Sequence, residues 1–255
     1  MNPLTYSEIE FLKDIVKKSA LISIDAFTTK NFSIHQKIDG SKVTSVDIEV
    51  SKFINSAISQ KFPNIPIICE EGGLRNFSGK KFFLIDPIDG TSSFAKGIDQ
   101  FCINLALIDD QKPVFGIINA PLFEGGKIAY NNKASEVLLN EKVVTNKKSS
   151  SKNIKIVTSS RLSDDFIKDF ISENFPSYVD NFELEKISSA VKFFRILENK
   201  ADLYFHSRPS MEWDTAAGQV LVELFGAKMV NLKNKKTLTY NKSGFLNEGF
   251  LVSRF

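Results

Sequence analysis

The stretch LIDPIDGTSSF, residues 84–94, places two aspartates at the end of an apolar segment. Carboxylates at the end of a buried strand are unfavourable unless a cation or hydrogen-bond donors compensate their charge. In an extended chain, neighbouring side chains alternate between the two faces. A turn driven by the proline after Asp86 would break this alternation. It would bring Asp86 and Asp89 to one point, with the carbonyl of Ile88 turned inward between them.

The next two residues, Gly90 and Thr91, extend this arrangement. Gly90 would let the backbone approach an anion closely. Thr91, at the start of a helical turn, would offer its N–H and hydroxyl to a phosphate oxygen or a water. The alternating aspartates of an EF-hand loop are missing, so that kind of calcium site is not indicated. The stretch also has a structural interpretation as a surface turn, because aspartate, proline and glycine all favour turns.

Further acids stand at the ends of other apolar segments. Glu70 and Glu71 end the strand-like PIICEE at 66–71, and Asp214 begins the helical DTAAGQVLVELFGA at 214–227. If these ends converge with the first stretch, several carboxylates share a small volume and cannot all stay ionised without cations. Carboxylate and carbonyl oxygens are the ligands that Mg²⁺ and Mn²⁺ prefer. The pattern therefore predicts a divalent-metal site.

Each of these acids also has a structural interpretation. Asp214 can be the N-cap of its helix, and Asp47 can be the acid of a capping box that begins with Thr44. Glu70 and Glu71 can be turn residues in contact with water. All these acids share a position at the ends of elements that follow apolar segments. This coincidence favours the interpretation as a functional site.

The distribution of apolar residues predicts an α+β pattern, in which two helices precede a run of mostly antiparallel strands. Helices are expected at 5–27, 44–62, 163–174, 188–199 and 214–227. Strands are expected at 66–70, 80–86, 101–109, 112–121, 154–160, 201–206 and 249–255, with a hairpin around the asparagines of 126–140. The polar segment TNKKSSSKN, 145–153, predicts a boundary. It would separate a metal- and phosphate-binding subdomain, 1–146, from a substrate subdomain, 147–255, that completes a cleft.

The composition is that of a globular protein, with 255 residues of which 42% are hydrophobic and 25% charged. There is no run of about 18 apolar residues that would predict a membrane span. The N-terminal segment lacks the apolar centre of a signal peptide, so a cytoplasmic protein is expected. Cys69 and Cys102 lie in apolar runs without a CxxC pair and are expected to be buried thiols. With two histidines in the chain, a zinc site is not indicated.

The charge pattern indicates the kind of partner. A net charge of +3 suits a small, highly anionic substrate. The lysine clusters NKKSSSK and LKNKKT have the composition of solvated loops, and basic residues are not interleaved with aromatic residues on a recognisable element. A nucleic-acid polymer is therefore not expected as a partner.

Three motifs in this order make the chain similar to the inositol monophosphatase superfamily of Mg²⁺-dependent phosphatases. They are EE at 70–71, DPIDGTSSF at 86–94 and WDTAAG at 213–218, and the resemblance covers nearly the whole chain. It implies a layered αβαβα fold of the sugar-phosphatase type, with two β-sheets and with helices between and outside them. It also implies a hydrolase that acts on a small anionic phosphate and occurs as a monomer or a homodimer.

Within the superfamily, four segments resemble the bacterial 3'(2'),5'-bisphosphate nucleotidases. They are KIDGSKVTSVD at 37–47, FCINLALIDDQKPVFGIINAP at 101–121, SSAVKFF at 188–194 and SMEWDTAAG at 210–218. This resemblance implies hydrolysis of 3'-phosphoadenosine 5'-phosphate to AMP and phosphate, a role in sulfur assimilation, and inhibition by lithium. Some relatives are described at the inner face of the membrane, although no amphipathic basic anchor is evident here.

Other functions stay open on the same fold. The chain can be an inositol monophosphatase or a fructose-1,6-bisphosphatase, which would differ in the pocket for the second phosphate. A more distant alternative is a non-catalytic sensor of a phosphometabolite or a divalent metal. Loss of a metal ligand or of the threonine would indicate such a sensor, and none of these residues is lost.

The resemblance also assigns metal ligands, which would hold two or three Mg²⁺ ions, with Mn²⁺ as an alternative. The ligands are the carboxylates of Glu70, Asp86, Asp89 and Asp214 and the carbonyl of Ile88. All of these except Asp86 would also border the substrate.

The resemblance assigns the other site residues by position. Gly90 and Thr91 match residues that receive the scissile phosphate. Asp47 and Thr91 match the pair that orients the attacking water, and Glu70 is counted with them as catalytic. Ser189 and Lys192 match positions that approach the nucleotide in relatives.

One departure from the family concerns the substrate's second phosphate. Relatives often carry an arginine soon after the tyrosine of the ADLY segment, where this chain has His206. A histidine is mostly neutral at pH 7 and lacks the fixed fork of donors that arginine offers to a phosphate. Arg208 and Lys192 are therefore the candidates for the second phosphate. His206 also has a structural interpretation, as a partly buried strand residue.

Overall fold

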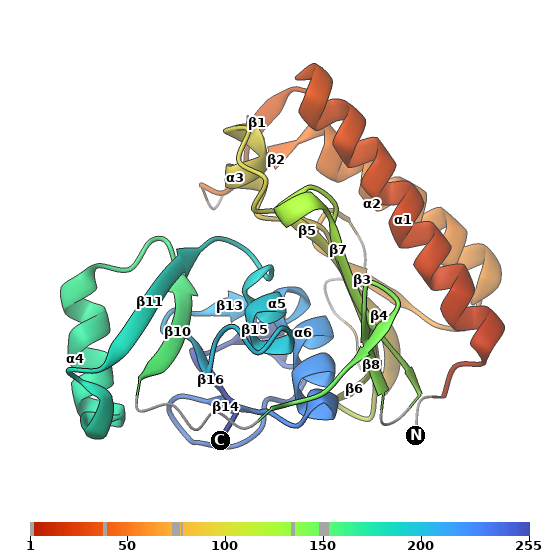
Figure 1. Ribbon diagram of the computed structural model, residues 1–255. Coiled ribbons are helices and arrows are strands. Elements are labelled where there is room, and N and C mark those ends of the chain that lie inside the picture. The colour runs from red at the N-terminus through yellow and green to blue at the C-terminus, as the bar shows by residue number, and fades with distance from the viewer. Residues whose placement is uncertain (1–2, 38–39, 73–76, 78, 134–135, 148–152) are drawn as a thin grey trace.

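Figure 1 shows a computed structural model of the protein, which describes residues 3–37, 40–72, 77, 79–133, 136–147 and 153–255. The chain forms five layers: a helical pair, a seven-stranded sheet, a central helical layer, a five-stranded sheet and an outer helix. Three separate clusters of buried apolar side chains fill the spaces between the layers. The predicted αβαβα fold with two sheets is confirmed.

The outer helical pair consists of α1, Tyr6–Thr29, and α2, Ser45–Lys61. Each begins with a capping box, in which a threonine and the acid three residues later satisfy each other's backbone N–H groups. The hairpin of β1, Ile34–Gln36, and β2, Lys42–Thr44, connects the two helices. The two predicted helices therefore exist, and α2 begins directly after Thr44.

The larger sheet follows the chain order, and only its first pair is parallel. Its strands are β3 (Ile67–Cys69), β4 (Lys81–Asp89), β5 (Cys102–Asp109), β6 (Lys112–Ala120), β7 (Lys127–Lys133), β8 (Glu136–Leu139) and β9 (Lys142–Val144). The buried strand β4 alternates between two cores. Phe83 and Ile85 pack toward α1 and α2, whereas Phe82 and Leu84 pack toward the central helices.

The smaller sheet has the order β11-β10-β12-β16-β14. Its strands are β10 (Ile154–Ser159), β11 (Phe182–Ile187), β12 (Leu203–His206), β14 (Lys228–Asn231) and β16 (Phe250–Ser253). The outer helix α4, Asp164–Asn174, covers its far face (Figure 1). Because β10 and β12 are parallel neighbours, their C-terminal ends meet at the same edge of this sheet. Short elements complete the fold: α3 (Thr91–Ala95), η1 (Phe123–Gly125), η2 (Pro176–Tyr178), β13 (Ser210–Met211), η3 (Ser243–Phe245) and β15 (Leu246–Asn247).

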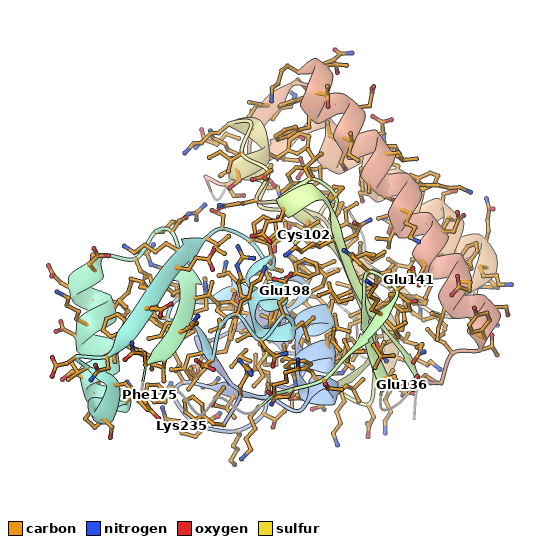
Figure 2. All side chains as sticks on the ribbon, in the orientation of Figure 1. Cys102, Glu136, Glu141, Phe175, Glu198 and Lys235 are labelled. Atoms are coloured by element: carbon orange, nitrogen blue, oxygen red, sulfur yellow. The ribbon has the colours of Figure 1, made fainter. Side chains whose placement is uncertain are left out.

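The central layer is formed by α5, Lys192–Leu197, and α6, Glu212–Phe225. Although α6 lies late in the chain, most of its contacts are with the larger sheet. It approaches β6 so closely that a Cβ atom at Gly116 would lie 2.6 Å from the carbonyl oxygen of Ala217. Side chains fill the interior between the sheets, where Cys102 lies (Figure 2). Both cysteines are buried and free, as predicted.

Several expected boundaries need correction. Strand β7 continues through the asparagines of the expected hairpin, and its connection to β8 at 134–135 lies outside the described residues. Helix α5 is shorter than the expected 188–199. Strands β11 and β14 were not predicted: β11 alternates with exposed acids as an edge strand, and β14 is short.

Two further predictions concern the whole chain. The division at 146/147 falls between β9 and β10, beside residues 148–152 that lie outside the described part, and it stays a prediction. No helix in the described ranges has the length and apolar character that crossing a bilayer would require.

Candidate active site

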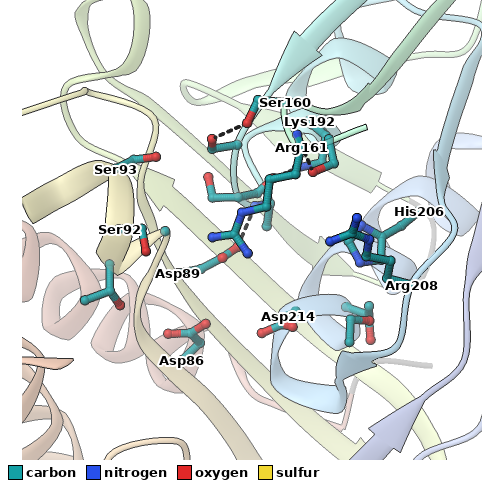
Figure 3. A pocket seen from close by; sticks show the side chains of 18 of the residues that line it. Asp86, Asp89, Ser92, Ser93, Ser160, Arg161, Lys192, His206, Arg208 and Asp214 are labelled. Carbon is teal, nitrogen blue, oxygen red and sulfur yellow. Dashed lines mark hydrogen bonds between the residues drawn. The ribbon is translucent and has the colours of Figure 1, made fainter. Parts of the chain in front are cut away.

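A bulge in β4, rather than a turn, brings the first two aspartates together. Asp86 lies opposite Asn104 of β5, and Asp89 lies opposite Cys102, so β4 contains one residue more than its partner over this interval. The backbone N–H of Ile88 donates a hydrogen bond to Asp86 Oδ1 at 3.0 Å. The expectation of a turn after Asp86 was therefore wrong. The extra residue interrupts the alternation of faces while the strand continues, so both acids line one pocket (Figure 3).

Three carboxylates from distant parts of the chain meet at one end of this pocket. Glu70 follows β3, Asp86 lies on β4 and Asp214 lies in the first turn of α6, and one oxygen of each is within 4.8 Å of the others. Burial, and then the charges of Glu70 and Asp89, raise the pKa of Asp86 well above its ordinary value. Burial, and then Asp89 and Glu70, do the same to the pKa of Asp214. Such a partly buried group of oxygen ligands fits a divalent cation.

Asp89 lines the same pocket but does not belong to this group of three carboxylates. Its Oδ2 atom accepts hydrogen bonds from the backbone N–H of Ala190 and from Asn104 Nδ2. Burial raises the pKa of Asp89, whereas the charge of Lys192 opposes that shift. The expected ligand Ile88 is buried at the same end, where its carbonyl oxygen lies 3.0 Å from Thr91 Oγ1.

A lysine that sequence reasoning missed contacts the acids after β3. Lys37 Nζ pairs with Glu70 Oε1 at 2.8 Å and also with Glu71. Burial lowers the pKa of Lys37, but the hydrogen bonds and charges of Glu70 and Glu71 together outweigh burial, and the net shift of the pKa is upward. Lys37 therefore holds a positive charge beside the acid group. Because 33 residues separate Lys37 from Glu70, no local pattern could have predicted the pair.

Thr91 and Asp47 form a hydrogen-bonded pair across two elements. Thr91 Oγ1 lies 2.9 Å from Asp47 Oδ1, within hydrogen-bond distance. The other carboxylate oxygen of Asp47 accepts hydrogen bonds from the backbone N–H and the hydroxyl of Thr44. Burial raises the pKa of Asp47, and the hydrogen bonds from Thr44 and Thr91 oppose that shift. Asp47 is thus both the capping-box acid and a partner of Thr91.

Asp214 has the same double role. Its Oδ2 atom accepts a hydrogen bond from the backbone N–H of Met211 at 2.9 Å, which satisfies the residue before α6. Asp214 is therefore the third residue of its helix, and the interpretation as an N-cap was wrong. A carboxylate in the first turn is also favoured by the helix dipole.

Gly90 is required by its backbone conformation and by its neighbours. Its φ is +95°, and a Cβ atom there would lie 2.7 Å from the carbonyl oxygen of Gln100 and 3.1 Å from the Cβ atom of Ser189. We expect Gly90→Ala to lower the free energy of unfolding by about 1–3 kcal/mol, measured by denaturant unfolding. Gly72→Ala is the matched control, because its φ is +101° but nothing lies within 4 Å. An equal loss in both variants would contradict the close approach at Gly90.

The pocket is also lined by basic residues and by His206. Lys192 is buried, and its Nζ donates hydrogen bonds to the carbonyl oxygens of Ile187 and Ser189. Burial lowers the pKa of Lys192 to about 8, against the charge of Asp89. Burial also lowers the pKa of His206 to about 4, so this side chain is neutral at pH 7. Its ring stacks on Phe250 with centroids 5.6 Å apart.

The pocket has a volume of about 520 Å³ and is lined by both sheets and the central helices. Arg161, after β10, is a lining residue that sequence reasoning missed. The signal was present, because SSR follows the apolar IKIVT just as EE follows PIIC. Figure 3 shows Arg161 directed into the pocket, His206 and Arg208 together at the right of the view, and Asp86 and Asp214 in its lower part. The predicted residues Gly90, Thr91, Ser189, Lys192 and Arg208 all line this pocket with the acids.

The raised pKa values predict how a cation stabilises the fold at different pH. The folded-state pKa values of Asp86 and Asp214 lie above the unfolded value of about 3.9. Their protonation therefore contributes stability that is complete below about pH 4 and is lost as pH rises through the folded values. A cation binds the ionised forms, so we expect the stabilisation by added Mg²⁺ to increase from pH 5 to pH 8. Denaturant unfolding with Mg²⁺ or with EDTA measures this difference, and a difference independent of pH would contradict it.

The comparisons with known proteins agree with this geometry. The sequence matches the family described as "Inositol monophosphatase family" over residues 6–251. The 3'(2'),5'-bisphosphate nucleotidase CysQ of Escherichia coli O6:H1 is 30% identical over 231 residues, which cover 88% of this chain and 90% of that protein.

Among solved structures, CysQ from Bacteroides thetaiotaomicron, described as a bacterial member of the inositol monophosphatase family, superposes with a TM-score of 0.81 at 23% identity. The superposition covers 99% of this chain and 98% of that one. Thermotoga maritima IMPase gives a TM-score of 0.78 at 23% identity, with 97% and 92% covered. These two structures show the fold.

Proposed function

The chain belongs to the inositol monophosphatase family, and we propose that it hydrolyses the 3'-phosphate of 3'-phosphoadenosine 5'-phosphate to give AMP and phosphate. The observation that carries the proposal is one pocket that brings together acidic and basic groups. Three carboxylates meet there, beside the pair of Thr91 and Asp47, and basic side chains line the same pocket. The names and sequence identities of the nucleotidase relatives support the choice of substrate.

The metal ligands in this proposal are Glu70, Asp86, Asp89 and Asp214, with the carbonyl of Ile88, and they would hold two or three Mg²⁺ ions. The group of Glu70, Asp86 and Asp214 supports it, because burial and the charges of neighbouring carboxylates raise the pKa of Asp86 and of Asp214. When bound, the ions supply a water of lowered pKa and neutralise charge on the transferred phosphoryl group.

The chain's own residues position the reacting groups. The hydroxyl of Thr91 accepts a proton from the attacking water while its own proton passes to Asp47 Oδ1. Thr44 holds the other oxygen of Asp47 and so fixes the direction of the pair. Gly90 lines the pocket, and its lack of a Cβ atom lets the backbone pack against Gln100 and Ser189 at the place where the scissile phosphate would lie. The phosphoryl group passes to water in line, without a covalent intermediate on the protein. Positioning and charge neutralisation account for the rate in this scheme.

The proposal extends to the rest of the chain. Residues 1–146 would contribute the scissile-phosphate groups and all the metal ligands except Asp214, and residues 147–255 would contribute Asp214 and the remaining substrate contacts. In this proposal the protein is a cytoplasmic enzyme of sulfur assimilation, and lithium inhibits it. An inositol monophosphatase or a fructose-1,6-bisphosphatase is the alternative, with the same metals and a different pocket for the second anion.

The test is a comparison of substrates. We expect the highest kcat/KM for 3'-phosphoadenosine 5'-phosphate, and lower values for inositol 1-phosphate and fructose 1,6-bisphosphate, with Mg²⁺ required for each. Phosphate release gives the rate, and identification of AMP as the nucleoside product gives the position of cleavage. The proposed substrate is wrong if inositol 1-phosphate or fructose 1,6-bisphosphate is hydrolysed more efficiently. Release of the 5'-phosphate would also contradict the proposal.

A further inference from the structure

The cationic residues of the pocket differ in what already binds them. The ammonium group of Lys192 is hydrogen-bonded to two backbone carbonyls. In contrast, the guanidinium groups of Arg161 and Arg208 line the pocket and make no hydrogen bond or ion pair with a described residue. The other two described arginines, Arg195 and Arg254, each bind acids within the fold. Arg161 and Arg208 are thus the described arginines whose donors remain available to a ligand.

The topology of the smaller sheet brings these two arginines to one place. Arg161 follows β10 and Arg208 follows β12, and the two strands are parallel neighbours. Their C-terminal loops therefore lie at the same edge of the sheet, on the side that faces the pocket. The charges of both arginines act on His206, where, after burial and Lys192, they help to lower its pKa. An electropositive region surrounds a neutral imidazole.

A third group at this end has no partner. The hydroxyl oxygen of Ser210 is buried and has no hydrogen-bond partner among the described residues, although Ser210 lines the pocket. A buried hydroxyl without a partner is unfavourable, and an anion oxygen would satisfy it. Among the described residues, the side chains available to a second anion therefore include two guanidinium groups and one buried hydroxyl without a partner.

We propose that Arg161 and Arg208, together with Ser210, bind the second phosphate of a bisphosphorylated substrate and so determine specificity. This inference rests on the proposed function, because the acid end of the pocket must take the scissile phosphate. Arginine presents a planar fork of donors that matches two phosphate oxygens, which neither the neutral His206 nor the committed Lys192 can do. Two arginines from neighbouring loops take over the role that the histidine cannot perform.

Two ligands that share the scissile ester test the proposal: 3'-phosphoadenosine 5'-phosphate and adenosine 3'-phosphate, which lacks the 5'-phosphate. We expect Arg161→Gln and Arg208→Gln each to reduce the ratio of their kcat/KM values about tenfold, and the double variant about 100-fold, since a charge-assisted hydrogen bond contributes that much. The loss should appear as a higher KM for the bisphosphate with a kcat that changes little. Lys168→Gln, which removes an equal charge from the exposed face of α4, is the matched control.

A binding measurement separates this inference from the proposed function. Calorimetry in EDTA compares AMP, which carries the 5'-phosphate, with adenosine. We expect the wild-type protein to bind AMP more tightly, and both arginine variants to lose that preference. Both side chains are exposed, and thermal unfolding verifies that the variants are folded.

The outcomes are distinct. If AMP binds no more tightly than adenosine, or if the folded variants keep the wild-type ratio, the assignment of Arg161 and Arg208 is overturned. If the wild-type protein does not hydrolyse the bisphosphate but the preference for AMP is present and depends on the arginines, the proposed function fails while the second-anion site stands.

Discussion

Asp86→Asn is expected to lower kcat/KM by on the order of 10³-fold or more, because the catalytic contribution of bound metal ions amounts to several kcal/mol. Asp86 is buried between Glu70 and Asp214, so the variant removes a charge from the centre of the acid group. The amide keeps the shape of the side chain, and its oxygen can still accept the hydrogen bond from the N–H of Ile88. Phosphate release at saturating and limiting substrate measures the loss.

The same variant should become more stable in EDTA. Burial and repulsion raise the pKa of Asp86, which means that its ionised form destabilises the folded state at pH 7. We therefore expect a higher denaturant midpoint for Asp86→Asn than for the wild-type protein in EDTA, and a smaller increase on adding Mg²⁺. Asp25→Asn, an exposed substitution on α1, is the control and should change neither quantity. Wild-type turnover in Asp86→Asn would refute the metal assignment.

Thr91→Val is expected to reduce kcat by about 10²–10⁴-fold, the range that positioned proton transfer contributes. Valine keeps the branched shape of threonine and removes the hydroxyl that lies against Asp47 Oδ1. Because Thr91 acts on the attacking water in the proposed scheme, the loss should appear in kcat more than in KM. Thr91→Ser retains the hydroxyl and should recover most of the rate.

The matched control for this prediction is Thr44→Ala. It removes the hydrogen bond to the other oxygen of Asp47 and the N-cap of α2, at a cost of about 1 kcal/mol in stability. Its effect on kcat should be far smaller than that of Thr91→Val. If the two variants lose rate equally, Thr91 acts by holding α2 in place, and the proton-transfer role is wrong.

Much of the acid site was predictable, because the signal was local. Each acid ends an apolar segment or begins a helix. The ends of strands and helices in a layered protein meet at the boundary between neighbouring layers. The interpretation of Asp47 as the acid of a capping box is confirmed, whereas its role beside Thr91 stays a prediction. Asp47 satisfies the backbone N–H of Thr44 with one carboxylate oxygen and binds the hydroxyl of Thr91 with the other. Asp214 likewise accepts the backbone N–H of Met211 while it belongs to the group of three carboxylates.

The parts that escaped prediction depend on contacts between distant segments. Lys37 meets Glu70 only when the β1–β2 hairpin lies beside the end of β3. The direction of Arg161 follows from the parallel pairing of β10 with β12, which the sequence does not specify. The bulge in β4 was mistaken for a turn because proline and glycine favour both.

The attachment of α6 has a mechanical consequence. Asp214 is fixed to the same sheet as Asp86, although 128 positions separate them, whereas Arg161 and Arg208 extend from the other sheet. A small rotation of one sheet against the other would leave the three carboxylates in the same positions relative to one another. It would change the distance between these carboxylates and the two arginines. Substitutions in the apolar layer around α5 could thus retune the length of molecule that fits between them, without altering a single cation ligand.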